Sequence, residues 1–266
     1  MIKSSRKYIG LEGIIRVMKV PIKKHCIRVF TALRKLIVAD IPRHFIIENT
    51  TFKSNIVIII DGPPASGKST IVEAVVSRWN ARSFRYKRLG IANILFDLLM
   101  KLAPCLQEDT PKSDRSDPII IVDSMFLKRM SALIILLEII YKYINVLSLL
   151  MLILTTRIMV VDEGILLGWA NYFNLMLRKK AFKPRHVDIL MKLDLASLRI
   201  LSRIRKVYYY FIDRDLEKLQ LFWFKRGNRI PYDTDFAVSV KYLFKFFSTV
   251  YQRYGIKAEM RYVYMR

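Results

Sequence analysis

The sequence predicts a three-layer α/β fold, in which a central parallel sheet carries helices on both faces. Three observations support this fold class. Short runs of β-branched and aromatic residues alternate along the chain with segments of helical spacing. A phosphate-binding motif follows the first of these runs, and a pair of carboxylates follows another. Strands that alternate with helices in this way pair in parallel and deliver polar side chains to one edge of the sheet.

The expected elements follow one another from about residue 54 onward. The strands are expected at 56–60, 83–89, 158–161, 207–212 and 260–264. Helical spacing covers a segment from 71, then 91–102, a segment from 125, then 187–202, 216–224 and 236–254. The polar tract 104–118 is bounded by prolines and is expected to be a loop. The tyrosines of the fourth strand are expected to serve the core and the sheet surface, because alternate residues of a strand face opposite sides.

Residues 61–70 read DGPPASGKST and contain the Gly-x4-Gly-Lys-Ser spacing of a phosphate-binding loop. Its two glycines permit backbone conformations in which successive N–H groups turn toward a polyphosphate, while the next helix adds its N-terminal dipole. Lys68 supplies a cation for the β- and γ-phosphates, and Ser69 places a hydroxyl where Mg²⁺ is usually bound. The expected nucleotide-binding residues are Gly62, Pro63, Pro64, Ala65, Ser66, Gly67, Lys68, Ser69 and Thr70.

A second acidic element is needed to hold Mg²⁺, and two strand ends compete for this role. We favour Asp162 and Glu163, because one acid can orient the magnesium together with Ser69 while the other meets an acceptor hydroxyl. Asp123 also ends an apolar run, but a residue at this place can equally cap the following helix. Asp61, directly before the loop, is a secondary candidate for the catalytic base beside Glu163.

The composition limits the binding partners and the cellular compartment that we expect for this protein. Forty-six Lys and Arg against 22 Asp and Glu give a formal net charge of +24, which favours nucleotides, nucleic acid or an anionic membrane surface. We do not expect nucleic acid, because the sequence contains no recognised nucleic-acid motif. The two cysteines lack the spacing of a zinc site or a disulfide framework. Since no secretory signal follows the basic amino terminus, we expect a cytoplasmic protein.

Residues 1–53 are expected to form a basic extension ahead of the main domain, 54–266. Apolar residues at helical spacing between Ile27 and Ile37 are interleaved with arginine and lysine, which predicts an amphipathic helix after Pro21. Such a helix would pack on the flank of the domain, or it would anchor the protein peripherally on anionic lipid.

The most apolar stretch runs from Ala132 to Leu154 and is about long enough to cross a bilayer. Glu138, Lys142 and Asn145 interrupt it, and a charge at mid-bilayer costs about 2.5–3.5 kcal/mol on insertion scales. We therefore expect a buried helix, or two helices joined near Asn145, in preference to a spanning helix.

From about Asn55 to Tyr264 the chain resembles the thymidylate kinase-like group of P-loop kinases, which includes poorly characterised members thought to serve surface-polysaccharide pathways. The resemblance is carried by GPPASGKST, by the apolar segment 125–154 ahead of RIMVVDEG, and by FIDRDLEKLQLFWFKRGNR. It implies a P-loop kinase fold with a lid, here near 225–232, whose arginines close over the transferring phosphate. By position these are Arg226 and Arg229, and a guanidinium can meet the developing charge through two donors.

The chain departs from this family in two places. Nucleotide kinases of the family usually have Asp-Arg at the strand end, whereas this chain has Asp162-Glu163, so a cation expected to hold an acceptor phosphate is missing. The basic run 178–186 is either a replacement for that cation or an ordinary solvated loop. The sequence also stops at Arg266, and the final helix and base-contacting loop of longer relatives are therefore expected to be absent.

These patterns together lead to the expectation of a kinase that uses ATP and Mg²⁺ and acts on a small hydroxyl or phosphate acceptor: a nucleotide, a nucleoside or a sugar. In this scheme Lys68 and the loop amides hold the donor, Asp162 helps to hold the metal, and the lid arginines neutralise the transition state. The alternative is a nucleotide-binding ATPase or switch protein at a membrane surface. A third reading, a polynucleotide kinase, predicts oligonucleotide binding that depends steeply on salt.

Overall fold

A computed structural model describes residues 55–85, 94–95, 97–98, 101–103, 122–228 and 231–265. The chain divides into two units, Met1–Glu48 and Asn49–Arg266, and the described residues belong to the second. The predicted amphipathic helix after Pro21, the predicted loop 104–118 and Arg229 of the predicted lid lie outside the described residues. So does much of the predicted helix 91–102, of which the described parts at 94–95, 97–98 and 101–102 are helical.

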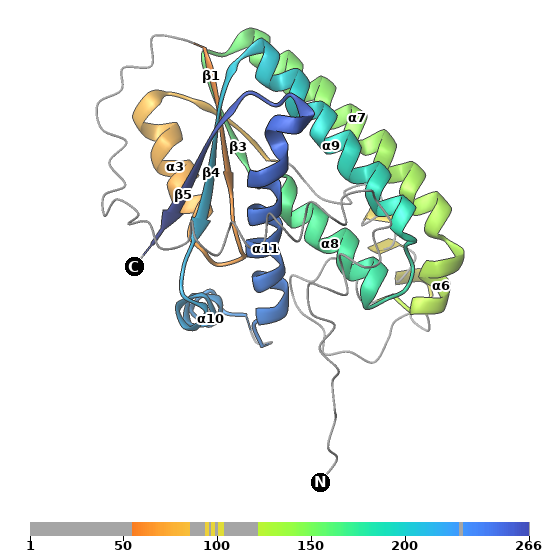
Figure 1. Cartoon of the computed structure of the whole chain (residues 1–266). Coiled ribbons are helices and arrows are strands. Elements are labelled where there is room, and N and C mark those ends of the chain that lie inside the picture. Colours follow the sequence, from red (N-terminus) through yellow and green to blue (C-terminus); the bar gives the residue numbers. More distant parts are fainter. Residues whose placement is uncertain are drawn as a thin grey trace. The chain divides into compact units, whose positions relative to one another are not determined.

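Five parallel strands form one sheet in this part of the chain, in the order β2-β3-β1-β4-β5 (Figure 1). They are β1 (Ile56–Asp61), β2 (Arg82–Arg85), β3 (Ile158–Asp162), β4 (Lys206–Asp213) and β5 (Ala258–Tyr264). The central strand, β1, pairs with β3 and β4, and all six of its residues are buried. A strand that is apolar on both faces requires helices above and below the sheet.

The helices meet this requirement. They are α3 (Lys68–Trp79), α6 (Ser124–Arg129), α7 (Ser131–Thr155), α8 (Ile165–Leu177), α9 (Pro184–Ile204), α10 (Leu216–Lys225) and α11 (Thr234–Val250), with a 3-10 turn, η2, at Tyr251–Tyr254. Helix α3 covers one face of the sheet, whereas α7, α8, α9 and α11 lie on the other face (Figure 1). The predicted fold class, a parallel sheet with helices on both faces, is thereby confirmed.

The tyrosine-rich strand β4 belongs to the core, as expected. Phe211 stacks on Phe244 of α11 with ring centroids 4.3 Å apart, and Tyr209 packs against Phe247 of the same helix at 5.2 Å. All residues of β4 after Lys206 are buried. Burial of these rings fixes α11 on the sheet, because large aromatic side chains contribute much of the apolar area that a core removes from water.

The basic run 178–186 is a loop up to Lys183, and its cations Arg178, Lys180, Lys183 and Arg185 are exposed, as expected of a solvated loop. Pro184 begins α9, where its fixed φ and missing N–H suit the first turn of a helix. Arg178 binds Asp233, at 2.8 Å, and Asp235, at 3.5 Å, and both acids stand at the amino end of α11. These ion pairs raise the pKa of Arg178. At least this cation of the run therefore joins the helices α8 and α11, which the sequence did not reveal.

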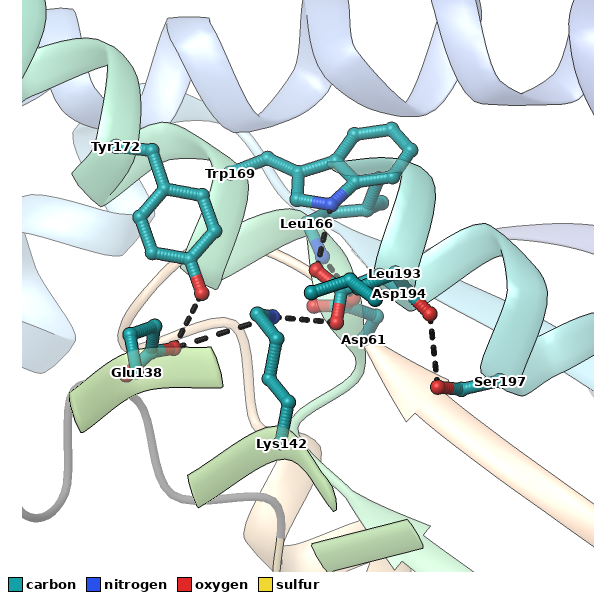
Figure 2. Close-up of polar contacts among 9 residues, drawn as sticks. All are labelled: Asp61, Glu138, Lys142, Leu166, Trp169, Tyr172, Leu193, Asp194 and Ser197. Atoms are coloured by element: carbon teal, nitrogen blue, oxygen red, sulfur yellow. Dashed lines mark hydrogen bonds and ion pairs between the residues drawn. The ribbon is translucent and has the colours of Figure 1, made fainter. Parts of the chain in front are cut away.

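Helix α7 is one unbroken helix of 25 residues, so the alternative of two helices joined at Asn145 is wrong. Its two charged residues, Glu138 and Lys142, face inward (Figure 2). Lys142 Nζ lies 2.5 Å from Asp194 Oδ1 of α9 and 3.9 Å from Glu138 Oε1, and each of these side chains is at most 3% exposed. Tyr172 of α8 donates to Glu138, and the Trp169 indole donates to Asp194 Oδ2 at 2.9 Å. The charges that interrupt the apolar run thus bind α7 to α8 and α9.

By length and composition alone, α7 could cross a membrane: it has a mean hydropathy of 2.0, and 28% of its most apolar window is buried in the described fold. One such helix is weak evidence for a membrane protein, since a core helix of a soluble protein passes the same test. The expectation of a buried helix holds for one face only. The other face presents apolar side chains to the outside.

Candidate active site

The phosphate loop connects β1 to α3 and depends on its two glycines. Gly62 has a φ of 148°, and a Cβ at this position would lie 2.2 Å from the carbonyl oxygen of Ile212 in the neighbouring strand β4. Gly67 has a φ of 94°, in the region that residues with a Cβ rarely adopt. No described side chain caps the amino end of α3, so its first N–H groups face the loop without a side-chain acceptor. This is the backbone arrangement that binds anions.

Packing from the carboxyl-terminal part of the chain holds the loop in place. Ala65 has a φ of 64°, a left-handed conformation that costs a residue with a Cβ about 1–2 kcal/mol. It is buried in a cluster with Leu219 of α10, Tyr232 and Ala237 of α11. The Tyr232 hydroxyl also donates to the carbonyl oxygen of Pro64 at 2.9 Å. The segment that joins α10 to α11 therefore supports the strained side of the loop.

Lys68 lies over its own loop. The side chain is 6% exposed, and Nζ donates to the carbonyl oxygens of Gly62 at 2.8 Å and Pro63 at 2.7 Å. Ser69 and Thr70, which follow it in the first turn of α3, are exposed. The ammonium of Lys68 and the hydroxyl of Ser69 thus both belong to the amino end of α3, where the helix dipole also favours an anion.

Asp162 lies at the end of β3, directly beside the end of β1, where it pairs in register with Ile60. It is 9% exposed, and its Oδ1 is buried without a hydrogen-bond donor among the described residues. Burial, and then the charge of Glu163, raise the pKa of Asp162. A buried carboxylate oxygen without a donor is costly, and a hard cation or its water would relieve that cost. The Oδ1 atom of Asp162 therefore fits the requirements of a Mg²⁺ ligand, and the exposed Ser69 hydroxyl is the other oxygen that the sequence predicts for this ion.

Further ligands for such an ion would have to come from nucleotide and water. In the part of the chain that the structure describes, no group of three or more His, Cys, Asp or Glu side chains could hold a metal. Mg²⁺ commonly keeps several waters and takes only one or two carboxylates beside phosphate oxygens. Asp123, the other candidate for the metal, is instead a helix cap. Its Oδ1 accepts the N–H of Phe126 at 2.8 Å at the start of α6.

Glu163 has an unexpected partner in Arg85, the last residue of β2. Arg85 Nη2 lies 3.0 Å from Glu163 Oε1, and its Nε lies 3.9 Å from Asp162 Oδ2. This contact raises the pKa of Arg85. Glu163 itself has a φ of 63°, and strained residues of this kind cluster at functional sites. A cation is therefore present at this strand end, because Arg85 of the neighbouring strand and Asp162 share one register position.

Asp61 is placed differently from a catalytic base. It is fully buried, and three donors bind its two oxygens: the N–H of Gly62 at 2.8 Å, the N–H of Leu166 at 3.0 Å and the Tyr209 hydroxyl at 2.7 Å. Burial raises the pKa of Asp61. A general base needs an oxygen within reach of the substrate proton. Asp61 instead ties the phosphate loop to the amino end of α8, which corrects its assignment as a second candidate base.

Replacing Gly164 by alanine is expected to lower the free energy of unfolding by about 1–3 kcal/mol, the usual cost of overpacking. Gly164 has an ordinary φ of −78°, so the backbone itself would accept alanine. The new Cβ would, however, lie 2.5 Å from Asp61 Oδ2 and 2.8 Å from the Tyr209 hydroxyl. Urea unfolding measures the loss, and the same change at Gly227, where a Cβ meets nothing within 4 Å but φ is 80°, separates crowding from backbone strain.

Two arginines flank α10, and one of them lies at the phosphate loop. Arg226, predicted for the lid, is exposed at the carboxyl end of α10. Arg214, which follows β4 directly, is 9% exposed, and its guanidinium lies 4.5 Å from the Phe222 ring. Its Nη2 lies 3.9 Å from the position of a Cβ on Gly67, and its Nε has no hydrogen-bond partner among the described residues. Arg214 thus brings a buried cation to the phosphate loop, which sequence reasoning missed.

Comparison with known proteins adds three solved structures. Thymidylate kinase from Candida albicans is 13% identical over 80% of this chain and 85% of its own, with a TM-score of 0.45. Deoxyadenosine kinase from M. mycoides with bound dCTP is 11% identical over 77% and 88%, with a TM-score of 0.43. Shikimate kinase from Acinetobacter baumannii in complex with shikimate is 8% identical over 79% and 83%, with a TM-score of 0.36. No protein-family model and no curated protein matches the chain.

Proposed function

We propose that this protein is a kinase that transfers the γ-phosphoryl group of ATP, with Mg²⁺, to a small hydroxyl or phosphate acceptor. One observation carries the proposal. A phosphate-binding loop with its lysine stands at the end of β1, and a buried carboxylate oxygen without a donor stands at the end of the adjacent strand. A loop that binds a polyphosphate and an acid that can hold its metal are the two parts that phosphoryl transfer from a nucleotide requires.

The roles of the residues follow from their positions. The N–H groups at the start of α3 bind the phosphates of the donor, and Lys68 leaves the carbonyl oxygens of Gly62 and Pro63 to contact the β- and γ-phosphates. Ser69 and Asp162 would hold Mg²⁺, which when bound neutralises charge on the phosphate oxygens. Arg214 adds a guanidinium group at the loop. The predicted lid arginines, Arg226 and Arg229, would neutralise charge in the transition state.

Glu163 and Arg85 are proposed to face the acceptor. Glu163 accepts the proton of the acceptor hydroxyl, or orients an acceptor phosphate through Arg85, whose side chain is 60% exposed and so can reach a ligand. A nucleotide, a nucleoside and a sugar all fit this chemistry. A sugar would agree with the resemblance to kinases of surface-polysaccharide pathways.

Exchanging Arg85 for alanine is expected to raise the KM for an anionic acceptor at least about 10-fold, because a bidentate guanidinium contact to phosphate is lost. The KM for a neutral acceptor should change much less. Arg85→Lys keeps the charge but not the fork of donors, so it is expected to recover part of the affinity. An equal rise in KM for both kinds of acceptor would instead mean that Arg85 serves only to hold Glu163.

The experiment that tests the proposed function follows ADP release from Mg-ATP by the purified full-length protein in the presence of nucleosides, nucleoside monophosphates or sugars. Release that one class of acceptor stimulates supports the proposal, and the labelled phosphate must appear on that acceptor. ATP hydrolysis that no acceptor stimulates would favour a nucleotide-dependent switch instead. Absence of both ADP release and nucleotide binding would overturn the proposal.

A cytoplasmic protein held peripherally at an anionic membrane by residues 1–53 remains part of the proposal. The supporting observation is the basic, amphipathic pattern of that extension, which lies outside the described residues. Flotation with anionic vesicles at physiological salt, with and without residues 1–53, tests it. If the full-length protein fails to float, this part of the proposal is wrong.

A further inference from the structure

The amino ends of the strands form the edge of the sheet opposite the phosphate loop, and we call it the amino edge. Because the strands are parallel, each element that leads into a strand also ends at this edge. Helix α3 leads into β2, α7 into β3, α9 into β4, and the turn η2 into β5. Four described segments therefore meet at the amino edge: 78–82, 151–157, 199–206 and 251–258.

These four segments carry nine Lys and Arg and no Asp or Glu. All nine cations except the half-buried Arg205 are exposed: Arg78, Arg82, Arg157, Arg199, Arg203, Arg205, Lys206, Arg253 and Lys257. Among the described acids, Glu259 pairs with one of them, with its Oε2 3.8 Å from Lys206 Nζ. Asp162 and Glu163 belong to the opposite edge, since they end a strand. Within the described fold, the amino edge is therefore a strongly cationic surface.

The register of the sheet arranges cations of the amino edge in a row. Ile56, the first residue of β1, pairs with Ile158 of β3 on one side and with Lys206 of β4 on the other. Arg157 directly precedes Ile158, and Lys257 directly precedes β5. Since neighbouring strands lie about 4.8 Å apart, the order β3-β1-β4-β5 separates the backbones of Arg157 and Lys257 by roughly 15 Å. A row of this length can contact several anionic groups at once.

Helix dipoles explain only part of this charge. A cation near the carboxyl end of a helix offsets the helix dipole, and Arg78 and Arg203 stand in the last turns of α3 and α9. The last turn of α7 holds no cation, however, and Arg157, Lys206 and Lys257 stand at the starts of strands. Like charges on one surface repel each other and attract a polyanion. The amino edge therefore has the charge of a binding surface for a polyanion.

Exposed aliphatic side chains stand beside these cations. Helices α7 and α9 lie side by side, and both end at the amino edge (Figure 1). Near these ends Met151 and Leu154 of α7 are 67% and 76% exposed, and Ile200 and Ile204 of α9 are 44% and 49% exposed. Cations that contact lipid headgroups, together with apolar side chains that enter the acyl boundary, are typical of surfaces that bind an anionic membrane.

Nucleic acid is the other common polyanion, and it fits this surface less well. Proteins that bind single strands stack the bases on aromatic side chains. Tyr254, at 38%, is the one exposed aromatic residue in the four segments of the amino edge. The most exposed large side chains in these segments are aliphatic, and aliphatic side chains offer no ring on which a base can stack.

We propose that the amino edge, together with the carboxyl ends of α7 and α9, binds an anionic lipid membrane. In this orientation the phosphate loop, at the opposite edge of the sheet, faces the solution, so that nucleotide and acceptor keep free access. Each Lys or Arg near an anionic membrane strengthens binding by about 5-fold. The inference depends neither on the reaction proposed above nor on residues 1–53, because every residue that carries it belongs to the described domain.

Co-sedimentation of the full-length protein with vesicles tests the proposal. We expect binding to vesicles that contain phosphatidylserine but not to vesicles of phosphatidylcholine alone, and salt should weaken it by screening exposed charges. The double variant Arg157→Glu/Lys257→Glu reverses two exposed cations of the amino edge. Because each reversal both removes a cation and adds an anion, we expect the affinity to fall at least about 100-fold.

The matched control is the double variant Lys128→Glu/Lys218→Glu, which has the same net charge. Both lysines are exposed and stand away from the amino edge. Lys128 belongs to α6, which the whole length of α7 separates from that edge, and Lys218 belongs to α10, which follows the carboxyl end of β4. This control should lose much less affinity for the anionic vesicles than the variant at the amino edge.

A second pair of variants tests the apolar part of the surface. Leu154→Gln is expected to weaken vesicle binding at least about 5-fold, because it removes an exposed leucine that would enter the acyl boundary. Leu221→Gln changes an exposed leucine on α10 and should bind like the wild type.

Several outcomes would overturn the proposal. Wild-type protein that does not bind the anionic vesicles would exclude it, and oligonucleotide binding that Arg157→Glu/Lys257→Glu abolishes would then assign the edge to nucleic acid. Vesicle binding that this variant retains would assign the membrane contact to residues 1–53. Equal losses in both double variants would mean that only net charge matters. Circular dichroism and urea unfolding of the variants must match the wild type, and Arg157→Gln/Lys257→Gln is the milder pair if the glutamates disturb the fold.

Discussion

Replacing Lys68 by alanine is expected to lower the kcat of phosphotransfer by about 10²- to 10³-fold, the usual cost of removing one preorganised charge or donor from a transition state. In the described structure Lys68 Nζ is held 2.8 Å from the carbonyl oxygen of Gly62 and 2.7 Å from that of Pro63. These contacts hold the Lys68 ammonium against its own loop before a nucleotide binds. When a nucleotide binds, the ammonium exchanges these carbonyl oxygens for the phosphates and then meets the charge that develops on the transferred group.

The same change should affect stability only slightly. Two carbonyl oxygens lose a donor, which costs about 1–2 kcal/mol if water does not replace it. Thermal unfolding of the variant without ligand therefore separates a catalytic loss from a folding loss. Lys245→Ala, which removes an exposed lysine of α11, is the matched control and should keep full activity. Unchanged kcat in Lys68→Ala would mean that this loop does not hold the donor phosphates of the reaction measured.

The parts of the site that the sequence could predict are those in which local pattern and chemistry coincide. The loop 61–70 was recognisable because its glycines, its lysine and its serine must occur at fixed spacing to surround a phosphate. Asp162 was recognisable because a β-branched run ends in it, and the register of β3 with β1 places it beside the loop. The order of strands and helices likewise followed from periodicity alone.

The parts that escaped prediction depend on contacts between distant segments. Arg85 looked like an ordinary residue of a strand, and only the pairing of β2 with β3 brings it to Glu163. Asp61 looked like an available acid, yet the fold surrounds it with donors from α8 and β4. Arg214 lies in the passage 211–229 that carries the resemblance, but nothing in its local pattern singled it out, and its guanidinium reaches the loop while packing against Phe222.

Replacing Lys142 by alanine is expected to have the largest effect on stability, a loss of about 3–5 kcal/mol in the free energy of unfolding. Lys142 is 2% exposed and stands between two carboxylates, Asp194 at 2.5 Å and Glu138 at 3.9 Å. Its removal leaves both acids in an apolar interior without their cation. A buried charge without a partner costs far more than the ion pair itself contributes, because the pair repays the desolvation only when both members are present.

An exposed ion pair on α9 provides the control for this prediction. Lys192 of α9 pairs with Asp188 at 2.7 Å, but its side chain is 61% exposed. Lys192→Ala is therefore expected to cost much less than Lys142→Ala. Urea unfolding of the purified chain measures both losses. If Lys142→Ala cost no more than Lys192→Ala, the charges of α7 would not be buried against α8 and α9. The orientation of α7, and with it the apolar outer face, would then have to be reversed, since a helix that turns Lys142 to the outside must turn its leucines inward.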